Sequence, residues 1–477
     1  MVDTAGPSLS VAPLAEEPSP GFSVTLRVSV PNTSTATGEL VATVTASQAV
    51  LTALDVVESL GDRLTVDVSC DALGVEHMRL VASHLGNLPG VEVRNVSDRT
   101  FLSHLGGKIS ISARAPIQHR DDLARIYTPG VARVSQAIHR HPDDVYNLTM
   151  KRNTVAVVTD GSAVLGLGNL GAEAALPVME GKAVLFKRFA DVDAWPVCLA
   201  TQDVDEIVRT VEIIAPAYGG INLEDIAAPR CFEIERRLRA SLDIPVFHDD
   251  QHGTAIAVLA ALWNALALVG KHLESARIVV SGVGAAGTAV IHLLLAAGAT
   301  DIVASDRDGV LYDGKPGLSG PCQEVARRTN PRRLTGRLPH VMAGADVFIG
   351  LSVGDLLSED DVAAMAPDGI VFALANPRPE VDLRLARRHA AVVASGRSDE
   401  INQINNVLVF PGFFRGLLDA RCRRVSTGME LAAARALASL VTPDRRSASY
   451  IIPNVFDSDV VPAVAKVVAE VGRAEAV

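Results

Sequence analysis

The sequence contains few cysteines, few aromatic residues and no excess of positive charge. Its five cysteines are far apart in a chain of 477 residues, and none of them forms a C-x-x-C pair. This pattern supports neither a disulfide framework nor a thiolate metal site, and it fits a reducing compartment, the cytoplasm. Lysine and arginine number 44 against 55 aspartate and glutamate residues, which gives a net charge of -11. Nucleic-acid-binding proteins usually present a basic face, so we expect small metabolites as partners and no nucleic acid.

The chain also lacks the pattern of a secretory signal and of a membrane span. Its first 20 residues have no basic segment followed by an apolar one, and their proline, serine and glutamate content predicts a disordered tail. The uncharged stretch 278–300 is long enough to cross a bilayer, but a glycine turn divides it into a β-branched run and a run rich in alanine and leucine. This division predicts a strand followed by a helix, and no membrane association.

Residues 21–97 have the pattern of a small module of strands and helices. Strands are predicted at 22–30, 54–58, 64–72 and 91–97, and helices at 38–50 and 75–85. This βαββαβ order is that of a ferredoxin-like sandwich. RNA-recognition modules share the order but need stacking aromatics and positive charge, whereas Phe22 is the only aromatic residue here. The segment resembles an ACT domain, which implies a small-molecule effector, and a purely structural dimerisation module is the alternative.

From about residue 98 the pattern alternates between strands and helices, which predicts an α/β fold with parallel sheets covered on both faces. Strands are predicted at 154–159, 195–199, 220–223 and 245–247, and a second alternating block begins at Arg277. The chain is too long for a single hydrophobic core. We therefore expect two α/β domains, at 98–253 and 254–477, and we expect the helices of about 412–477 to pack back on the first of them.

A G-x-G-x-x-G pattern occurs twice. The first, at Gly166, Gly168 and Gly171, stands apart from the preceding strand, and we interpret it as a tight turn that opens a helix. The second follows a buried strand directly and opens a helix, and the next strand ends at Asp306 about 20 residues later. This context predicts a Rossmann-type dinucleotide site whose turn consists of Gly282, Val283, Gly284, Ala285, Ala286 and Gly287.

Asp306 determines the expected cofactor. A carboxylate at the end of the second strand accepts hydrogen bonds from both ribose hydroxyls and repels a 2′-phosphate, so it favours NAD. The adjacent Arg307 keeps NADP open. A glycine-rich packing turn without a ligand is the alternative interpretation of the whole segment.

Two pairs of acidic residues follow neighbouring strands. Glu224 and Asp225 end one predicted strand, and Asp249 and Asp250 end the next. A right-handed crossover makes these strands parallel, so four carboxylates are expected at the same sheet edge. Carboxylates packed so closely either share protons or hold a cation, and an all-oxygen site suits Mg²⁺ or Mn²⁺. The alternative, that the acids only cap helices, explains one acid per helix and leaves the doublets unexplained.

The same stretch nearly spells the H-E-x-x-H zinc motif, with His248 and His252 four residues apart. A zinc site of this kind needs both histidines on one helix. Pro245 and the residues after it predict a strand that ends at His248, and Gly253 is expected to lie where the next helix begins. The histidines would then straddle a turn, which argues against zinc.

From about residue 101 to the end, the sequence resembles the malic enzymes, in particular the short bacterial NAD-type form preceded by an ACT domain. Seven motifs in the same order carry the resemblance: "YTPGVA" at Tyr127, "EGKAVLFK" around Lys182, "NLEDI" at Glu224, "FHDDQHGT" at Asp249, "GVGAAG" at Gly282, "ANP" at Asn376 and "NNVLVFPG" at Asn405. The resemblance implies that 98–253 is the substrate and metal domain and that 254–477 binds NAD.

The resemblance also implies roles for individual residues. It makes Tyr127 and Lys182 the acid and base, with Asp249 orienting a Lys182 of depressed pKa. It makes Glu224, Asp225 and Asp250 the divalent-metal ligands, and it implies that Asn376 and Asn406 contact substrate or nicotinamide. Larger family members carry an arginine for the malate carboxylate in a segment where Ser162 and Ala163 stand here, so the group that binds the distal carboxylate is open.

The implied activity is oxidative decarboxylation of L-malate to pyruvate and carbon dioxide with reduction of NAD, in a homodimer or higher homo-oligomer. Two enzymatic alternatives use the same site without net NADH release, namely conversion of malate to lactate and decarboxylation of oxaloacetate. A non-catalytic regulator with an ACT module is a third alternative, and it has no need of Tyr127, Lys182 and the acidic doublets.

Overall fold

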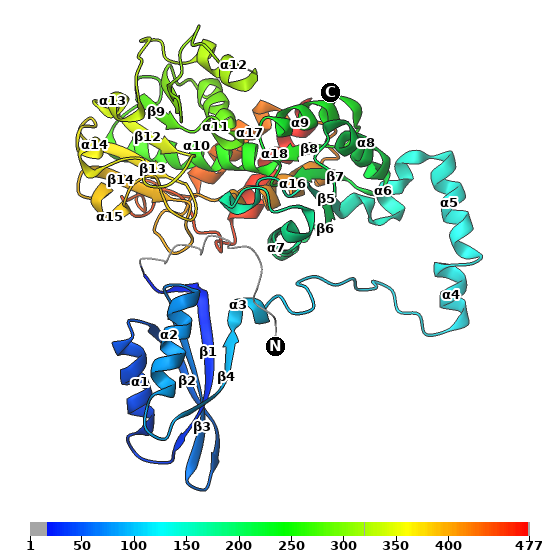
Figure 1. The fold of residues 1–477 in the computed structure, drawn as a ribbon. Helices are drawn as coiled ribbons and strands as arrows, with labels where there is room; N and C mark the ends of the chain where they lie inside the picture. Colours follow the sequence, from blue (N-terminus) through cyan, green and yellow to red (C-terminus); the bar gives the residue numbers. More distant parts are fainter. Residues whose placement is uncertain (1–16, 319, 476–477) are drawn as a thin grey trace. The chain divides into compact units, whose positions relative to one another are not determined.

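The structure is a computed structural model that describes residues 17–318 and 320–475. Most of the predicted disordered tail lies outside the described residues. The chain forms two compact units, Met1–Ser110 and Ile111–Val477, and each is described by itself below (Figure 1).

The first unit is an antiparallel sheet with two helices. Its sheet has the order β2-β3-β1-β4, and β1 pairs antiparallel with both β3 and β4. This confirms the predicted βαββαβ topology. The elements are β1 (Ser19–Pro31), α1 (Ala36–Ala46), β2 (Val50–Leu60), β3 (Arg63–Ala72), α2 (Val75–Gly86), β4 (Glu92–Asp98) and the short α3 (Arg99–Leu102).

The two faces of this sheet differ in polarity because side chains alternate along a strand. On β1, Leu26 and Val28 are buried in a core that the two helices also line. On the other face, Arg27 forms a bidentate ion pair with Asp67 of β3, at 2.7 Å for each bond. The module therefore has a core of its own.

The second unit contains two parallel sheets. The first has the order β6-β5-β7-β8, and all its pairings are parallel. Its strands are β5 (Thr154–Thr159), β6 (Asp193–Cys198), β7 (Gly220–Leu223) and β8 (Val246–His248), and its crossover helices are α7 (Ala172–Ala190), α8 (Val204–Ile214) and α9 (Arg230–Ser241). The four predicted strands are confirmed. As expected, the first glycine motif forms a turn that leads into α7, and its three glycines all have positive φ.

The second sheet has the order β11-β10-β9-β12-β13-β14 and is parallel except for β11. This is the expected Rossmann-like arrangement, and the apolar stretch 278–300 is a strand followed by a helix. The elements are β9 (Arg277–Ser281), α11 (Ala285–Ala296), β10 (Asp301–Asp306), β11 (Gly309–Val310), α12 (Gly320–Arg328), α13 (Leu338–Met342), β12 (Val347–Gly350), α14 (Glu359–Ala363), β13 (Gly369–Ala373), α15 (Leu383–Ala386) and β14 (Ala390–Ser395).

The long helix α10 (Asp249–Val269) joins the two sheets. Among the described residues it is the one helix long and apolar enough to cross a membrane, but 67% of its most apolar window is buried in the protein. The predicted domain boundary after residue 253 falls inside it. Its side chains belong to a core that includes Val155 of the first sheet and Ile278 of the second, so the two sheets share one hydrophobic core.

Three C-terminal helices close this core: α16 (Phe410–Asp419), α17 (Thr427–Ser439) and α18 (Val460–Glu475). The ring of Phe186 on α7 packs edge-on against Phe410 and Phe414 of α16, with centroid distances of 4.7 and 5.3 Å. Asn264 of α10 donates to the carbonyl of Ala438 at the end of α17. The C-terminal helices thus contact both the first block and α10.

A helical hairpin precedes the first sheet. It consists of α4 (Arg120–Ile126) and α5 (Gly130–Arg140), and neither helix contains a buried residue. The short α6 (Val145–Leu148) then leads to β5. In Figure 1 the hairpin, drawn in cyan, stands clear of both sheets of its unit.

Candidate functional site

Four carboxylates lie together at the C-terminal edge of the first sheet. Leu223 of β7 is paired with His248 of β8, so the residues that follow them lie side by side. One carboxylate oxygen each from Glu224, Asp225 and Asp250 lie within 4.8 Å of one another, and within residues 17–318 and 320–475 this is the one group of acids, histidines or cysteines spaced to hold a metal ion. The backbone N–H of Asp225 donates to Asp250 Oδ2 at 3.0 Å.

The backbone holds these acids in place. Asp249 and Asp250 form the first turn of α10, where the helix dipole favours negative charge. Asp225 has a φ of 53°, a left-handed conformation that costs about 1–3 kcal/mol for a residue with a side chain. Such a conformation persists only where the surrounding structure imposes it. Here the strained residue lies two positions after the end of the buried strand β7.

The carboxylates are short of positive charge. Burial and the neighbouring Asp250 and Glu224 raise the pKa of Asp225 to about 8. Burial likewise raises the pKa values of Glu224 and Asp250. Asp225 Oδ2 is buried without a hydrogen-bond partner among the described residues. An all-oxygen set with an unpartnered buried oxygen fits a hard divalent cation such as Mg²⁺ or Mn²⁺.

Lys182 of α7 is the cation that the structure places in this cluster. Its Nζ lies 2.5 Å from Asp249 Oδ2 and 2.9 Å from Glu224 Oε1, and 4.1 Å from the ring centroid of Phe410. Burial alone would lower the pKa of Lys182, but Asp249 and Glu224 outweigh it and raise the pKa above the usual lysine value. The expectation of a depressed pKa is therefore wrong for this arrangement, because two carboxylates stabilise the ammonium form.

The two histidines of the motif have separate partners. His248 precedes α10 in an extended conformation. His252 lies inside the helix, where its Nε2 is 2.9 Å from Glu235 and its Nδ1 is 2.9 Å from Glu430. Burial opposes protonation, but these carboxylates raise the pKa of His252 to about 9. His252 is thus an imidazolium clamped between α9 and α17, and the two histidines do not converge on a metal.

The expected helix start at Gly253 is wrong, because α10 begins four residues earlier, at Asp249. Gly253 has a different role. A Cβ at this position would collide with Asp249 Oδ1 and approach Asn406 Cβ to 3.1 Å. The glycine therefore allows the carboxylate that contacts Lys182 to pack against the helix, and it places Asn406 next to this carboxylate.

The second glycine motif connects β9 to α11. Gly282 has a φ of 97°, and a Cβ there would lie 2.5 Å from the carbonyl oxygen of Leu351. A Cβ on Gly287 would collide with the carbonyl of Gly282, so this glycine seats the helix against the turn. A Cβ on Gly284 would meet nothing within 4 Å. The open side of the turn at Gly284 faces the helix N-terminus, the position that binds a pyrophosphate in this motif.

Asp306 ends β10, as predicted, and its Oδ1 accepts a hydrogen bond from the backbone of Asp308 at 2.9 Å. The side chain of Arg307 is 93% exposed. The basic group close to Asp306 is instead Lys315, whose Nζ lies 3.6 Å from its Oδ1. Lys315 was not predicted from the sequence, where the available signal was a lysine between glycines in the loop after Asp306.

The two asparagines lie on loops around the cluster. Asn376 is exposed in the loop after β13, and a Cβ on Gly166 would lie 2.7 Å from its carbonyl oxygen. Asn406 begins the turn before α16, next to Gly253. The turn before α7 therefore contacts the loop that carries Asn376.

Ser162 and Ala163 serve to join two loops. Ser162 Oγ donates to Asp160 Oδ1 at 2.5 Å and accepts from the backbone of Ala227. Ala163 N donates to the carbonyl of Asp225. A basic group that was not predicted lies here as well: Arg230 Nη2 is 3.2 Å from Asp160 Oδ2. Arg230 begins α9, five positions after Asp225.

Tyr127, the predicted acid, does not lie at this cluster. It caps the C-terminus of α4 and is 67% exposed. Its hairpin stands clear of both sheets of the second unit (Figure 1).

Comparison with known proteins assigns the chain to a family. The family described as "Malic enzyme, N-terminal domain" matches residues 106–239, and the one described as "Malic enzyme, NAD binding domain" matches residues 251–475. The chain belongs to the malic enzyme family. The two matches lie on either side of the acidic doublet that begins α10.

Similar malic enzymes come from several prokaryotes. The NAD-dependent malic enzyme of Geobacillus stearothermophilus is 55% identical over 417 residues, 87% of each chain. The bifunctional malic/malolactic enzyme of Bacillus subtilis is 54% identical over 366 residues, 76% of this chain and 89% of the other. The crystal structure of the NAD-dependent malic enzyme of Thermotoga maritima has a TM-score of 0.76 at 46% identity, and it covers 78% of this chain and 99% of its own.

Proposed function

We propose that this chain is an NAD-dependent malic enzyme that converts L-malate to pyruvate and carbon dioxide. The observation that carries the proposal is the position of Lys182, held between Asp249 and Glu224 within a buried group of carboxylates. Removal of a hydride from a hydroxyl-bearing carbon requires a base for the hydroxyl proton and a dinucleotide that accepts the hydride. The chain offers a base beside a candidate cation site and a domain with a dinucleotide-binding fold.

Glu224, Asp225 and Asp250 would hold a divalent cation. When bound, the cation supplies Lewis-acid polarisation of the substrate oxygen, which favours both oxidation of the alcohol and loss of the adjacent carboxylate. The three acids fit it because burial raises the pKa of each of them, and neighbouring carboxylates raise the pKa values of Glu224 and Asp225 further. Each gains a counter-charge from it.

Lys182 would accept the proton of the substrate hydroxyl, with Asp249 holding its ammonium group in place. Asp249 and Glu224 stabilise the protonated form of Lys182, and this stabilisation must be weakened before Lys182 can act as a base. Positive charge among the carboxylates has this effect, because it lowers the negative potential at Lys182 Nζ. Lys182 can therefore act as a base only when the metal ligands hold their cation. Tyr127 is the proposed acid that protonates the enolate.

Three further groups would select substrate and cofactor. Asp306 favours NAD over NADP through the ribose hydroxyls, and Lys315 beside it reduces the repulsion of a 2′-phosphate. Asn376 and Asn406 would contact the substrate or the nicotinamide, and Arg230 would supply positive charge for a substrate carboxylate.

The first unit is proposed to be an ACT-like module that binds a small-molecule effector. Its ferredoxin-like topology supports this assignment, and a structural dimerisation module remains the competing interpretation. A cytoplasmic location and a homo-oligomeric state complete the proposal.

The test is a steady-state assay with L-malate, Mn²⁺ and either NAD or NADP. We expect one NADH for each carbon dioxide released, faster turnover with NAD, and loss of activity with a chelator. Lys182→Ala should lower kcat at least about 100-fold, as removal of a general base typically does. Lys187→Ala, on the exposed end of α7, is the matched control and should keep activity. Full turnover in Lys182→Ala would reject the proposed base.

A malolactic activity is the second candidate, because the Bacillus subtilis relative is named a bifunctional malic/malolactic enzyme. It would produce lactate from malate without net NADH. Following lactate and NADH in the same reaction separates the two activities.

A further inference from the structure

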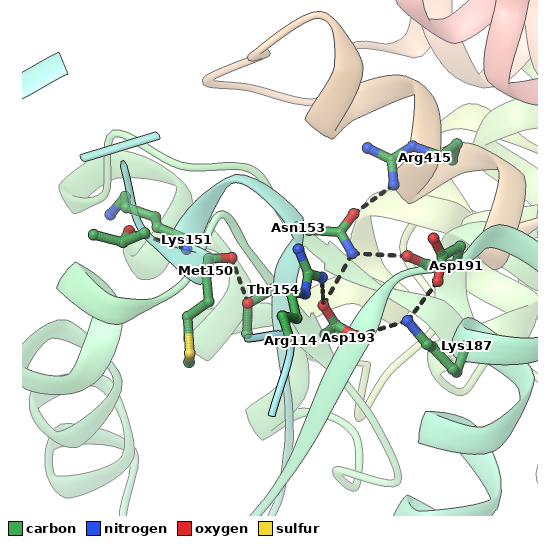
Figure 2. Close-up of polar contacts among 10 residues, drawn as sticks. Arg114, Met150, Lys151, Asn153, Thr154, Lys187, Asp191, Asp193 and Arg415 are labelled. Carbon is green, nitrogen blue, oxygen red and sulfur yellow. Dashed lines mark hydrogen bonds and ion pairs between the residues drawn. The ribbon is translucent and has the colours of Figure 1, made fainter. Parts of the chain in front are cut away.

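The α4–α5 hairpin is anchored at the sheet edge opposite the carboxylate cluster. Before α4, Arg114 Nη2 pairs with Asp193 Oδ2 at 3.0 Å. Asp193 is the first residue of β6 and also accepts from Asn153, which directly precedes β5. Asn153 in turn accepts from Arg415 of α16 at 2.6 Å. Figure 2 shows this chain of contacts from Arg114 to Arg415.

The other end of the hairpin is anchored at the same edge. After α5, Asn147 accepts from Arg421 at 2.7 Å, and Lys151 donates to the carbonyl of Pro216 at 2.9 Å. These residues lead into the N-terminal end of β5. Because all strands of this sheet are parallel, the acids after Leu223 and His248 lie at its C-terminal edge. The hairpin thus leaves the unit on the side away from its own cluster.

The hairpin has an apolar surface that its own chain leaves uncovered. On α4, Leu123, Ile126 and Tyr127 share one face at helical spacing and are 49%, 43% and 67% exposed. Val131 and Val134 continue such a stripe on α5, where no residue is buried. Helices of 7 and 11 residues are marginal alone in water, so they need a surface to pack against.

A second uncovered apolar surface lies beside the carboxylate cluster. Leu165 and Leu167, on the turn before α7, are 60% and 61% exposed, and Leu176 on α7 is 42% exposed. The backbone of Leu165 is hydrogen-bonded to Asp225, so this rim lies directly at the proposed metal ligands. The cluster contains the proposed base and metal ligands, whereas the proposed acid, Tyr127, lies on the hairpin away from them.

We propose that two copies of this chain exchange their α4–α5 hairpins, so that Tyr127 of one copy completes the site of the other. The proposal rests on the role of Tyr127 as the acid in the proposed function. A two-fold arrangement covers both apolar surfaces twice, because each copy offers one hairpin and one rim. The alternative is that the hairpin folds back onto the rim of its own chain.

Subunit complementation distinguishes these arrangements. Chains with Tyr127→Phe and chains with Lys182→Met are co-expressed with two different tags, and the doubly tagged oligomer is purified. Each variant alone should lose at least about 100-fold in kcat. In the mixed dimer one site then has both altered residues and the other has neither, so about half of the normal kcat should return.

The reciprocal mixture gives the opposite result and serves as the control. A chain carrying both substitutions, combined with the unaltered chain, should be inactive, since each exchanged site contains one defect. If this mixture is active and the first is inactive, Tyr127 acts within its own chain and the proposal is overturned while the proposed function stands. Full kcat in Tyr127→Phe alone would reject the acid role itself. If Lys182→Met does not fold, Asp225→Asn takes its place, with the same expected outcomes.

Discussion

Asp249 is the residue whose charge most directly controls Lys182. It is fully buried, and its Oδ2 lies 2.5 Å from Lys182 Nζ. Asp249→Asn keeps the shape but removes the charge that holds the ammonium group, so we predict a kcat about 10 to 100 times lower with little change in the KM for NAD. Asp205→Asn, which weakens an exposed pair with Arg237, is the control. Equal kcat values in the two variants would show that Asp249 has no positioning role.

The metal ligands allow a test that needs no turnover. Binding of Mn²⁺ to the native state should raise the midpoint of thermal unfolding, since the cation relieves the repulsion among Glu224, Asp225 and Asp250. We predict that Asp250→Asn weakens the binding of Mn²⁺ at least about 10-fold and largely removes this stabilisation. Calorimetric titration with Mn²⁺ measures the first quantity and scanning calorimetry the second. Unchanged affinity in Asp250→Asn would place the ion elsewhere.

Arg230 is the arginine that the structure offers in place of the one missing near Ser162. Its guanidinium is one-third exposed and pairs with the buried Asp160. Arg230→Met should raise the KM for malate about 10-fold or more, the cost of losing a charge-assisted contact to a carboxylate, and leave the KM for NAD unchanged. Arg236→Met, on the exposed side of α9 beside Glu233, is the control. A KM for malate that does not change would leave the distal carboxylate to another group.

At this scale the sequence predicted the carboxylate cluster but not its surroundings. The acids directly follow strand ends, which is a local pattern in the sequence. Because neighbouring parallel strands end at the same sheet edge, these acids lie close together. His252 could not be interpreted in the same way, because its partners Glu235 and Glu430 stand on two other helices, and spacing in the sequence does not show that these helices meet at His252. Lys315 and Arg230 were missed for a similar reason. Their roles depend on which loop folds back onto which strand end, and spacing alone does not specify this.

Among the elements, the β9 to α11 turn was predicted correctly and the start of α10 was not. The turn carries its own signature, since glycine is required wherever a backbone approaches closely. The apolar pattern of α10 becomes regular only after Gly253, so the first turn of the helix looked like a loop. It is helical because Asp249 and Asp250 sit at the positive end of the helix dipole and because Gly253 leaves room for Asp249.

The last two glycines of the second glycine motif, Gly284 and Gly287, should respond differently to alanine. Gly287→Ala places a Cβ against the carbonyl of Gly282, and we predict that it lowers the free energy of unfolding by about 1–3 kcal/mol. The Cβ added by Gly284→Ala meets no atom within 4 Å, so the free energy of unfolding should not change. NAD binding should weaken, because this Cβ occupies the side open to the pyrophosphate. Urea unfolding and fluorescence titration with NADH measure the two effects. Similar losses of stability in both variants would contradict this division of roles.

At the scale of the whole chain, the first unit and the second are built on separate cores. The core of the first unit is formed by residues between Val24 and Leu85, with no member from the α/β body, whereas the largest core of the second unit extends from Val155 to Val468. The sequence predicted the small module because its strand and helix periods alternate clearly. The extent of the shared core was harder to predict, because α10 and the C-terminal helices join sheets that the pattern presents as separate.

Removal of residues 1–110 should therefore leave a folded and active enzyme. The match to the Thermotoga maritima structure covers 99% of that structure but only 78% of this chain. This agrees with a second unit that folds without the first. We predict that residues 111–477 unfold cooperatively in urea and turn over malate with a kcat within about 3-fold of the full chain, since no core residue of the body is removed. If the first unit binds an effector, the shortened chain should also lose any response of kcat or KM to that small molecule. A shortened chain that aggregates or loses its activity would instead show that the first unit stabilises the body or its oligomer.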